Sequence, residues 1–487
     1  MHAGLASLRG RRRKMAPRIN QAMNSVSSAP ASLGDGPVPS KDLGDVRSLP
    51  ASARFQNPRI LLAATLRWPL AARLAMALHK LACPIHVWCP AGHPLERMHI
   101  AERIHRSSAL APRRSLQTAI RAAAVDFIIP CDDDAAVLLH HLHAFSDKSG
   151  LASPAEAAAR TLIERSLGTP ASCSLATNRN DLMHLAGSAG LRVPLTRALD
   201  SPAALDDWAA QHRFPAVLKI DGSWGGLGVT VVHDIQQAQR ALQAAMRPSV
   251  TRALTQLILR RDPSYLLRCL RGARPAVTIQ KFITGRPANC AVACWQGEVL
   301  AGISVVAIQS QGPIGPATVV QVIKNEEMSE TARRLVRVLG LSGLYGMDFV
   351  IEASTGAAYL IEVNPRATPI SHLALGAGQD LPAALCAQLR GELPSAEAPV
   401  IRNDVIALFP GEWRRDPQSP YLYNAIHDVP WDNVELMRDC TEPLWETRGI
   451  AARIKARLVP RSAPALACVE VTVRPATHAP PPRHWAP

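Results

Sequence analysis

Residues 57–150 alternate between short apolar runs and longer segments with helical periodicity. Strands that alternate with helices predict a parallel sheet covered by helices on both faces. The expected strands are Arg59–Thr65, Ile85–Cys89 and Asp126–Ile129, and the expected helices are Pro69–Lys80, Leu116–Ala124 and Ala135–His143.

Three aspartates, Asp132–Asp134, follow the third expected strand. Ligands of parallel sheets bind beyond the carboxyl ends of the strands, so these side chains could contact a substrate. An aspartate at this position can instead cap the following helix, and we favour the cap. No GxGxxG follows the first strand, so the sequence does not support a dinucleotide site here.

The next segment, residues 151–395, mixes helices with strands that turn back on one another. We expect a lysine strand at Phe214–Ile220 and a partner strand at Val229–Val232, with helix signals over residues 235–275. The other expected strands are Val277–Ile283, Ala288–Cys294 and Val299–Val306, and the other expected helices are Pro154–Leu167, Asp181–Ala189, 327–340 and Ser371–Leu389.

Lys219 lies on the lysine strand, which leads directly into a glycine-rich loop. In a Walker loop the lysine follows the glycines and a helix comes next, so this order is different. A flexible hairpin of this kind can close over nucleotide phosphates, because glycine lets backbone N–H groups approach the oxygens. The alternative is an ordinary glycine-rich hairpin. The candidate phosphate ligands are Lys219, Ser223, Gly225, Gly226 and Gly228.

Two acids converge in the stretch 343–366. Apolar runs at Met347–Ile351 and Ala358–Val363 flank a turn, and a hairpin centred on Thr355 places Asp348 opposite Glu362. Residues opposite each other on antiparallel strands have Cβ atoms about 5 Å apart, and Asn364 points to the same face as Glu362. Such oxygen ligands suit Mg²⁺. The alternative is a solvated face.

The net charge of +15 is concentrated in two ends and one insert. Residues 1–56 carry nine Lys or Arg and three acids, residues 451–487 six and one, and residues 243–275 seven and one. The rest of the chain is close to neutral, so we do not expect a folded nucleic-acid-binding face. We interpret the basic insert as a solvated helical face, with contact to an acidic substrate as the alternative.

The chain has ten cysteines and no CxxC pair, which is typical of a reducing compartment, and we therefore expect a cytoplasmic protein. We interpret Cys290 and Cys294 as small buried strand residues. The sequence contains no uninterrupted run of 18 apolar residues, so we do not expect a membrane-spanning helix. Residues 1–56 and 456–487 are predicted to be disordered, and 396–455 to form a C-terminal appendage.

Three motifs occur in order: the lysine strand with its glycine hairpin, the strand ending QKFITG, and the acid hairpin ending EVNPR. Together they resemble the ATP-grasp superfamily over about residues 150–390. The resemblance implies an α/β pre-ATP-grasp domain at 57–150, followed at 151–395 by an α+β ATP-grasp fold. It also implies a mobile lid at about 200–283 and ATP held between two subdomains.

By this resemblance, ATP phosphates would contact Lys219 and the glycine loop, and Arg179 stands where the family often has a second lysine. Gln280 would lie near the adenine, which Lys281, Phe282 and Ile283 would also contact. Mg²⁺ or Mn²⁺ would be held by Asp348, Glu362 and Asn364, and Arg366 would stabilise the transferring phosphate. Asp221 departs from the family pattern, which usually has a neutral residue there.

The implied reaction joins a carboxylate to an amine, or less often to a thiol, through an acyl phosphate. The substrates would be small molecules or peptides, and we allow for a homodimer. The alternatives are a carboxylase-like or kinase-like use of the same site and a non-catalytic ATP-binding scaffold with basic arms. A biotin-carrier Met-Lys-Met motif is absent from the sequence.

Overall fold

A computed structural model describes residues 55–147, 153–168, 178–220, 228–246, 276–312, 315–393 and 404–441. The predictions for the N-terminal arm up to residue 54, for residues 221–227, for the arginines of the insert and for the Pro-rich tail lie outside the described residues.

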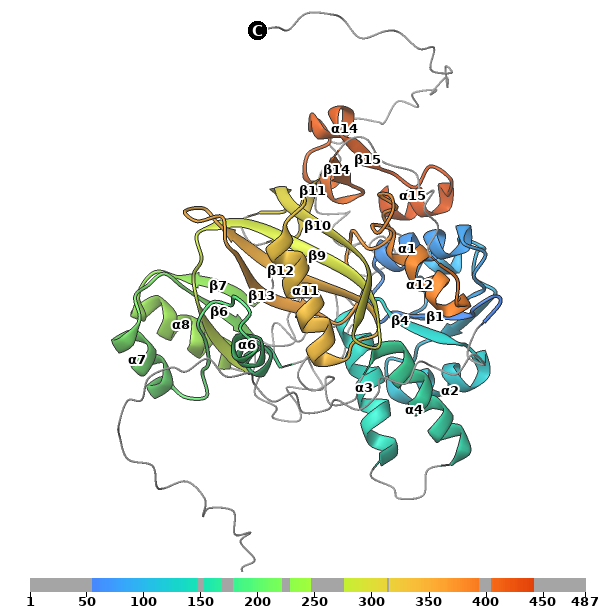
Figure 1. Cartoon of the computed structure of the whole chain (residues 1–487), viewed down its shortest axis with the longest axis horizontal. Coiled ribbons are helices and arrows are strands. Elements are labelled where there is room, and N and C mark those ends of the chain that lie inside the picture. Colours follow the sequence, from blue (N-terminus) through green and yellow to red (C-terminus); the bar gives the residue numbers. More distant parts are fainter. Residues whose placement is uncertain are drawn as a thin grey trace, which may run out of the picture. The chain divides into compact units, whose positions relative to one another are not determined.

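The N-terminal region forms a four-stranded parallel sheet in the order β3-β2-β1-β4 (Figure 1). It confirms the α/β alternation predicted from the sequence. The strand β3 was not predicted, because its sequence RIHR is polar and mostly exposed at the sheet edge. The elements are β1 (Ile60–Ala63), α1 (Pro69–Lys80), β2 (Ile85–Cys89), η2 (Pro94–Glu96), β3 (Arg103–Arg106), α2 (Pro112–Ala123), β4 (Phe127–Pro130), α3 (Asp133–Asp147) and α4 (Pro154–Leu167).

The lysine strand belongs to a second sheet of four antiparallel strands in the order β5-β8-β6-β7. Helices α7 and α8 cover it through a core that includes the fully buried Trp208. The elements are α6 (Arg179–Ser188), β5 (Thr196–Ala198), α7 (Pro202–Gln211), β6 (Ala216–Ile220), β7 (Val229–Val232), α8 (Ile235–Met246) and β8 (Val277–Lys281).

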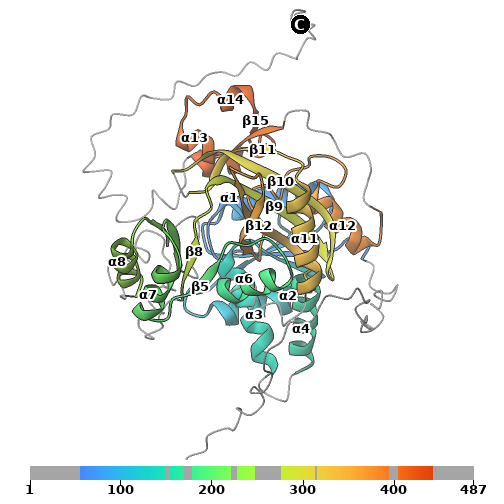
Figure 2. The same cartoon turned by 60° about the vertical axis from the view of Figure 1, so that its left-hand side comes forward.

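The acid hairpin lies at one edge of a seven-stranded sheet in the order β13-β12-β9-β10-β11-β14-β15. Figure 2 shows its strands β9, β10, β11 and β12 from a second direction. Strands β14 and β15 come from the predicted C-terminal appendage and pair with this sheet. The strands are β9 (Gly285–Trp295), β10 (Glu298–Ser310), β11 (Ala317–Val322), β12 (Gly343–Glu352), β13 (Ala358–Asn364), β14 (Val405–Leu408) and β15 (Ile426–Asp428). The helices are α11 (Glu326–Leu339), α12 (Leu381–Arg390), α13 (Gly411–Arg415), α14 (Tyr421–Asn424) and α15 (Val434–Thr441).

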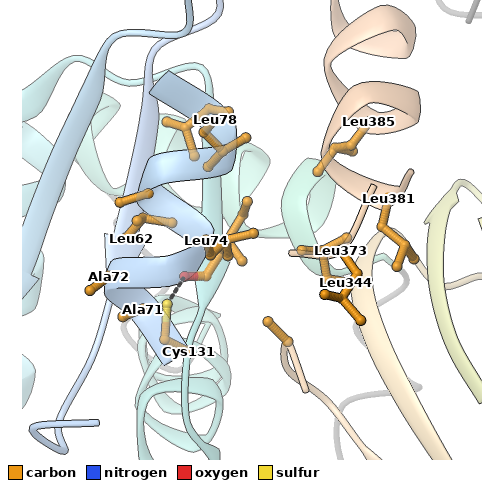
Figure 3. Packing of buried hydrophobic residues seen from close by; sticks show 14 of the residues in the cluster. Leu62, Ala71, Ala72, Leu74, Leu78, Cys131, Leu344, Leu373, Leu381 and Leu385 are labelled. Carbon is orange, nitrogen blue, oxygen red and sulfur yellow. Dashed lines mark hydrogen bonds between the residues drawn. The ribbon is translucent and has the colours of Figure 1, made fainter. Parts of the chain in front are cut away.

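The two faces of the seven-stranded sheet bury different cores. One face packs against α11 and α6, and its strand residues include Met347, Phe349 and Leu360. The other face shares a core with α12 and with α1 of the N-terminal sheet, in which Leu74 and Leu385 take part (Figure 3). The alternation of side chains along the strands therefore decides which core each residue enters.

The predicted helix Ser371–Leu389 is wrong over its first half, because α12 begins only at Leu381. The preceding residues form turns, and Gly376 and Gly378 have φ of +116° and +73°. Asp380 accepts a hydrogen bond from the backbone N–H of Ala383 at 2.9 Å and so caps the helix. Two glycines with positive φ and an N-cap residue together place the helix start ten residues later than the apolar pattern indicated.

Cys290 and Cys294 are buried strand residues, as predicted. Burial raises the pKa of the Cys290 thiol to about 11 and raises that of Cys294 further. Among the described residues, no helix has the length and hydropathy needed to cross a bilayer.

Glu412 on α13 is a buried carboxylate that ties the C-terminal strands to β11. It accepts hydrogen bonds from Thr318 Oγ1 at 2.6 Å, from Arg415 at 2.6 and 2.7 Å, and from the Ser419 hydroxyl. Burial alone would raise the pKa of Glu412, but these donors lower it to about 2. The ionised carboxylate therefore contributes to folding.

We expect Glu412→Gln to lower the free energy of unfolding at pH 7 by up to about 3 kcal/mol. The folded pKa of Glu412 lies below the unfolded value of about 4.3, so the contribution is complete above that value and disappears as the pH falls towards 2. Urea unfolding from pH 7 to pH 2.5 should show the wild-type advantage shrinking across this window. An advantage that does not depend on pH would contradict the assignment.

Candidate functional site

The acid hairpin, formed by β12 and β13, pairs Asp348 with Glu362 as predicted. This pairing results from a β-bulge and not from the symmetric turn that we expected. Near the turn the pairs are Ile351 with Ala358 and Phe349 with Leu360, one residue off a hairpin centred on Thr355. Ile361 is the extra residue between the two registers. The predicted register is therefore confirmed at the acids and wrong near the turn.

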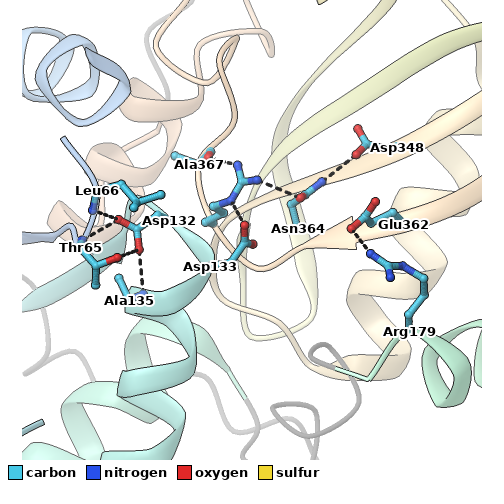
Figure 4. Close-up of polar contacts among 11 residues, drawn as sticks. Thr65, Leu66, Asp132, Asp133, Ala135, Arg179, Asp348, Glu362, Asn364 and Ala367 are labelled. Carbon is cyan, nitrogen blue, oxygen red and sulfur yellow. Dashed lines mark hydrogen bonds and ion pairs between the residues drawn. The ribbon is translucent and has the colours of Figure 1, made fainter. Parts of the chain in front are cut away.

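Asp348 is held by two amide side chains. Asn289 on β9, directly opposite Asp348, donates from Nδ2 to Oδ1 at 2.6 Å. Asn364 donates from Nδ2 to the other oxygen at 2.9 Å (Figure 4). Gly346 lies on the same strand, and a Cβ there would come within 2.0 Å of Thr368 Cγ2, so only glycine allows this close packing beside the acid.

Glu362 faces two cations from different elements. Arg179, at the first position of α6, lies 2.6 Å from Glu362 Oε1 (Figure 4). Lys219 on β6 is buried and donates from Nζ to the Ile361 carbonyl at 3.1 Å. The lysine ammonium therefore points at the acid hairpin and not into solvent.

The two carboxylates of the hairpin have opposite pKa shifts. Burial and the charge of Glu362 raise the pKa of Asp348, and the two amides only partly offset this. Burial would also raise the pKa of Glu362, but Arg179 and Lys219 hold it below its ordinary value. The site therefore carries negative charge at Asp348 that the protein compensates incompletely.

Arg366 connects this site to the N-terminal sheet. Its Nη2 donates to Asn364 Oδ1 at 3.1 Å, and its Nε lies 2.9 Å from Asp133 Oδ2 at the start of α3. The guanidinium also stacks over Trp68, which precedes α1, at 5.8 Å. Arg366 is buried among these partners.

Asp132 has the capping role that we favoured. Its Oδ1 accepts from the backbone N–H of Ala135 at 2.8 Å, and its Oδ2 accepts from the N–H groups of Thr65 and Leu66 at 2.6 and 3.0 Å (Figure 4). The carboxylate thus joins the ends of β1 and β4. Asp133, the next residue, is the member of this run that reaches the acid site through Arg366.

The predicted adenine residues lie on or directly after β8, next to the lysine strand. Gln280 is buried and donates from Nε2 to Thr196 Oγ1 at 3.0 Å. The backbone N–H of Lys281 donates to the Leu195 carbonyl at 2.9 Å, and the Lys281 side chain is exposed. Phe282 is half-buried and Ile283 is buried.

The glycine loop is represented in the structure by its last residue. Gly228 has φ of +83°, and its carbonyl accepts from the N–H of Ile220 at 2.9 Å, which closes the loop. Ser223, Gly225 and Gly226 lie outside the described residues.

The residues around Asp348 fit a hard cation such as Mg²⁺. Asn289 Oδ1 is buried and has no hydrogen-bond partner, next to two carboxylates of which one has a raised pKa. In the described part of the chain, no group of three or more His, Cys, Asp or Glu side chains is arranged to hold a metal. Mg²⁺ needs fewer, because one or two carboxylates and substrate phosphates usually hold it.

Sequence reasoning missed three residues of this site: Asn289, Asp133 and Trp68. Asn289 carried a usable signal, since it is the only polar residue in ANCAVAC (288–294). A lone amide in an apolar strand indicates a polar partner on the neighbouring strand. Asp133 and Trp68 reach the site through Arg366, because the N-terminal sheet packs next to the acid hairpin.

The profile of the ATP-grasp domain family matches residues 267–369, which include β8, β9 and the acid hairpin. The chain contains an ATP-grasp domain. The matched segment ends three residues beyond Arg366, so it covers the metal candidates and leaves Arg179 and Lys219 outside. No curated protein is significantly similar to the full sequence.

Solved structures with a similar fold match this chain at low sequence identity. Biotin carboxylase from Campylobacter jejuni, solved with a β-γ-ATP compound, has a TM-score of 0.51 at 16% identity, covering 72% of this chain and 74% of that chain. N5-carboxyaminoimidazole synthetase from Staphylococcus aureus, complexed with ADP, has 0.50 at 13%, covering 72% and 82%. The biotin carboxylase domain of 2-oxoglutarate carboxylase from Hydrogenobacter thermophilus has 0.50 at 14%, covering 71% and 70%.

We expect Asp348→Asn to raise the free energy of unfolding of the metal-free protein at pH 7. The folded pKa of Asp348 lies above the unfolded value, so ionisation costs stability that the neutral amide does not lose. Wild-type stability in EDTA should therefore fall as the pH rises from about 4, and the variant should not follow. Glu392→Gln, at an exposed acid, is the control.

Proposed function

We propose that this protein is an ATP- and Mg²⁺-dependent ligase that activates a carboxylate as an acyl phosphate for attack by an amine. The observation that carries the proposal is the convergence of Asp348 and Glu362 on one face with Lys219 from the lysine strand beside them. An ordinary glycine hairpin has no need of a buried lysine directed at a pair of carboxylates.

In this proposal Asp348, Glu362 and Asn364 hold Mg²⁺, with Asn289 orienting Asp348. Bound there, Mg²⁺ supplies positive charge beside the phosphate oxygens. Lys219 and Arg179 neutralise phosphate charge, and the backbone of the glycine loop covers it. The strand that carries Gln280 and leads to Ile283 provides the wall for the adenine. The ATP and MgADP complexes of the structural neighbours are consistent with this arrangement.

The chemistry takes place in two displacements. A carboxylate oxygen attacks the γ-phosphorus, the bond to the β–γ bridging oxygen breaks, and ADP leaves. The amine then attacks the acyl carbon, an amide C–N bond forms, and phosphate leaves with release of a proton. Positioning and charge neutralisation by the protein carry most of the rate, because phosphoryl transfer requires little covalent work from side chains.

Arg366 is the residue that we place next to the transferring phosphate. Its guanidinium already joins Asn364 of the metal site to Asp133 at the carboxyl end of the N-terminal sheet. That end of a parallel sheet is where ligands bind, so the carboxylate substrate would lie between the two.

Release of ADP and phosphate, measured with pooled carboxylates and amines, tests the proposed ligase. Bicarbonate belongs in the pool, because its use as the carboxylate would favour the carboxylase-like alternative. Release of ADP that requires both a carboxylate and an amine, with formation of an amide, supports the ligase. Tight ATP binding without turnover under any combination would support the non-catalytic scaffold.

We expect Lys219→Ala and Glu362→Ala each to lower kcat by at least about a hundredfold, because each removes charge that faces the transferring phosphate. Steady-state ADP release measures this. Lys80→Ala, at an exposed lysine at the end of α1 and outside the proposed site, is the control and should keep the wild-type rate within about threefold. Wild-type turnover in either site variant would show that the residues are wrongly assigned.

We expect Arg179→Met to reduce turnover more than Arg179→Lys does. Both variants lose the planar contact to Glu362, but lysine keeps a positive charge near the phosphate. A difference of about tenfold in kcat/KM for ATP between the two corresponds to about 1.4 kcal/mol. Equal losses would mean that the geometry of the guanidinium matters and its charge does not.

A further inference from the structure

The bulge at Ile361 changes which core the residues of β13 face. Ala358 and Leu360 enter the core shared with α11, and regular alternation would send Glu362 and Asn364 into the same core. Instead Val363 occupies that core, and Asn364 contacts Asp348 on the other face. One extra residue at the bulge therefore turns the two metal candidates out of an apolar core and towards Asp348.

The same extra residue presents its carbonyl to the lysine strand. The backbone N–H of Leu360 donates to the Arg192 carbonyl at 2.9 Å, away from β12, so this side of β13 is the sheet edge. At the next residue, Lys219 Nζ donates to the Ile361 carbonyl at 3.1 Å. The ammonium thus lies beside Glu362, whose pKa its charge helps to lower.

We propose that the bulge at Ile361 is a docking point for Lys219. The Ile361 carbonyl positions the lysine beside the acid pair before nucleotide binds. Ile361 is a positioning residue, since it acts through Lys219 and through the direction of Glu362. The role of this docking in ATP binding rests on the proposed function, in which Lys219 contacts the ATP phosphates. A lysine fixed in advance reduces the entropy that nucleotide binding must otherwise supply.

Deletion of Ile361 separates the two effects of the bulge. Without this residue, Leu360 precedes Glu362 directly, and regular alternation keeps Leu360 in the core and Glu362 opposite Asp348. The acid pair is preserved while the docking carbonyl is lost. The control is deletion of Ser354, which shortens the exposed turn of the same hairpin by one residue and leaves the bulge in place.

The first measurement is a thermal double-mutant cycle on the nucleotide-free protein, with Lys219→Met as the second change. We expect Lys219→Met to lower Tm by about 2–4 °C more in the wild type than in the Ile361 deletion. The contact with the carbonyl is lost only once, whereas the charge facing Glu362 is removed in both backgrounds. In the Ser354 deletion the full effect should persist. Equal effects of Lys219→Met in all backgrounds would overturn the proposal.

The second measurement is the kinetics of ADP release. We expect the Ile361 deletion to raise KM for ATP about tenfold while kcat stays within about threefold, because docking affects binding and not the chemical step. A fall in kcat with unchanged KM would overturn the positioning role. If the wild type shows no turnover, the proposed function fails, and the thermal cycle still decides whether Lys219 docks on the bulge.

If the Ile361 deletion does not fold, the carbonyl itself can be observed. The chain has three Ile-Glu pairs, at 163–164, 351–352 and 361–362, so ¹³C-carbonyl isoleucine with ¹⁵N-glutamate gives three signals. Ile361→Val removes and so identifies one of them. We expect that signal, and neither of the others, to shift in Lys219→Met. An unchanged signal would show that the lysine does not dock there.

Discussion

Two carboxylates on neighbouring strands, largely removed from water, are the constraint on which the rest of this structure depends. Side by side they repel each other, and burial makes each charge harder to maintain. The protein meets this cost unequally. Arg179 and Lys219 hold the pKa of Glu362 below its ordinary value, whereas two amides and the charge of Arg366 leave the pKa of Asp348 raised. The site is left short of positive charge at the position where a divalent cation would supply it. The ionised Asp348 therefore lowers the stability of the metal-free protein, and a bound cation would restore it.

The compensating groups come from elements far apart in the chain. Arg179 begins α6, Lys219 lies on β6 of the four-stranded antiparallel sheet, and Arg366 follows β13 and pairs with Asp133 at the start of α3. None of these elements places its cation correctly unless it packs against the acid hairpin. The electrostatics of one hairpin therefore depend on the correct packing of three other parts of the fold.

Much of this could be read from the sequence, and what could not be read has a physical reason. Strands β1, β2 and β4 of the N-terminal sheet, the lysine strand and the acid pair follow from local periodicity and turn signals, whereas the polar edge strand β3 does not. The pairing of Asp348 with Glu362 was predicted by assuming a symmetric turn, and a turn one residue away together with the bulge at Ile361 gives the same result. The bulge has no local sequence signature here. The prediction found the right pair because its error of one residue at the turn is offset by the extra residue at the bulge. Asn289 was missed because it becomes part of the site only through the register of a third strand.

The bulge also shows why function and core packing can be specified separately in one strand. Leu360 and Val363 enter the apolar core on either side of Ile361, and Glu362 and Asn364 lie on the opposite face with Asp348. In a strand with strict alternation, every second residue along the whole strand would face the apolar core. Glu362 could then be brought opposite Asp348 only by changing the length of the turn. The extra residue at Ile361 moves the alternation of side chains by one position between Leu360 and Glu362. The turn therefore need not set the direction of the acids, and its exposed residues can vary without changing it. The carbonyl released by the shift lies on the edge that faces the lysine strand, so the same local defect that orients the acids also joins the two sheets.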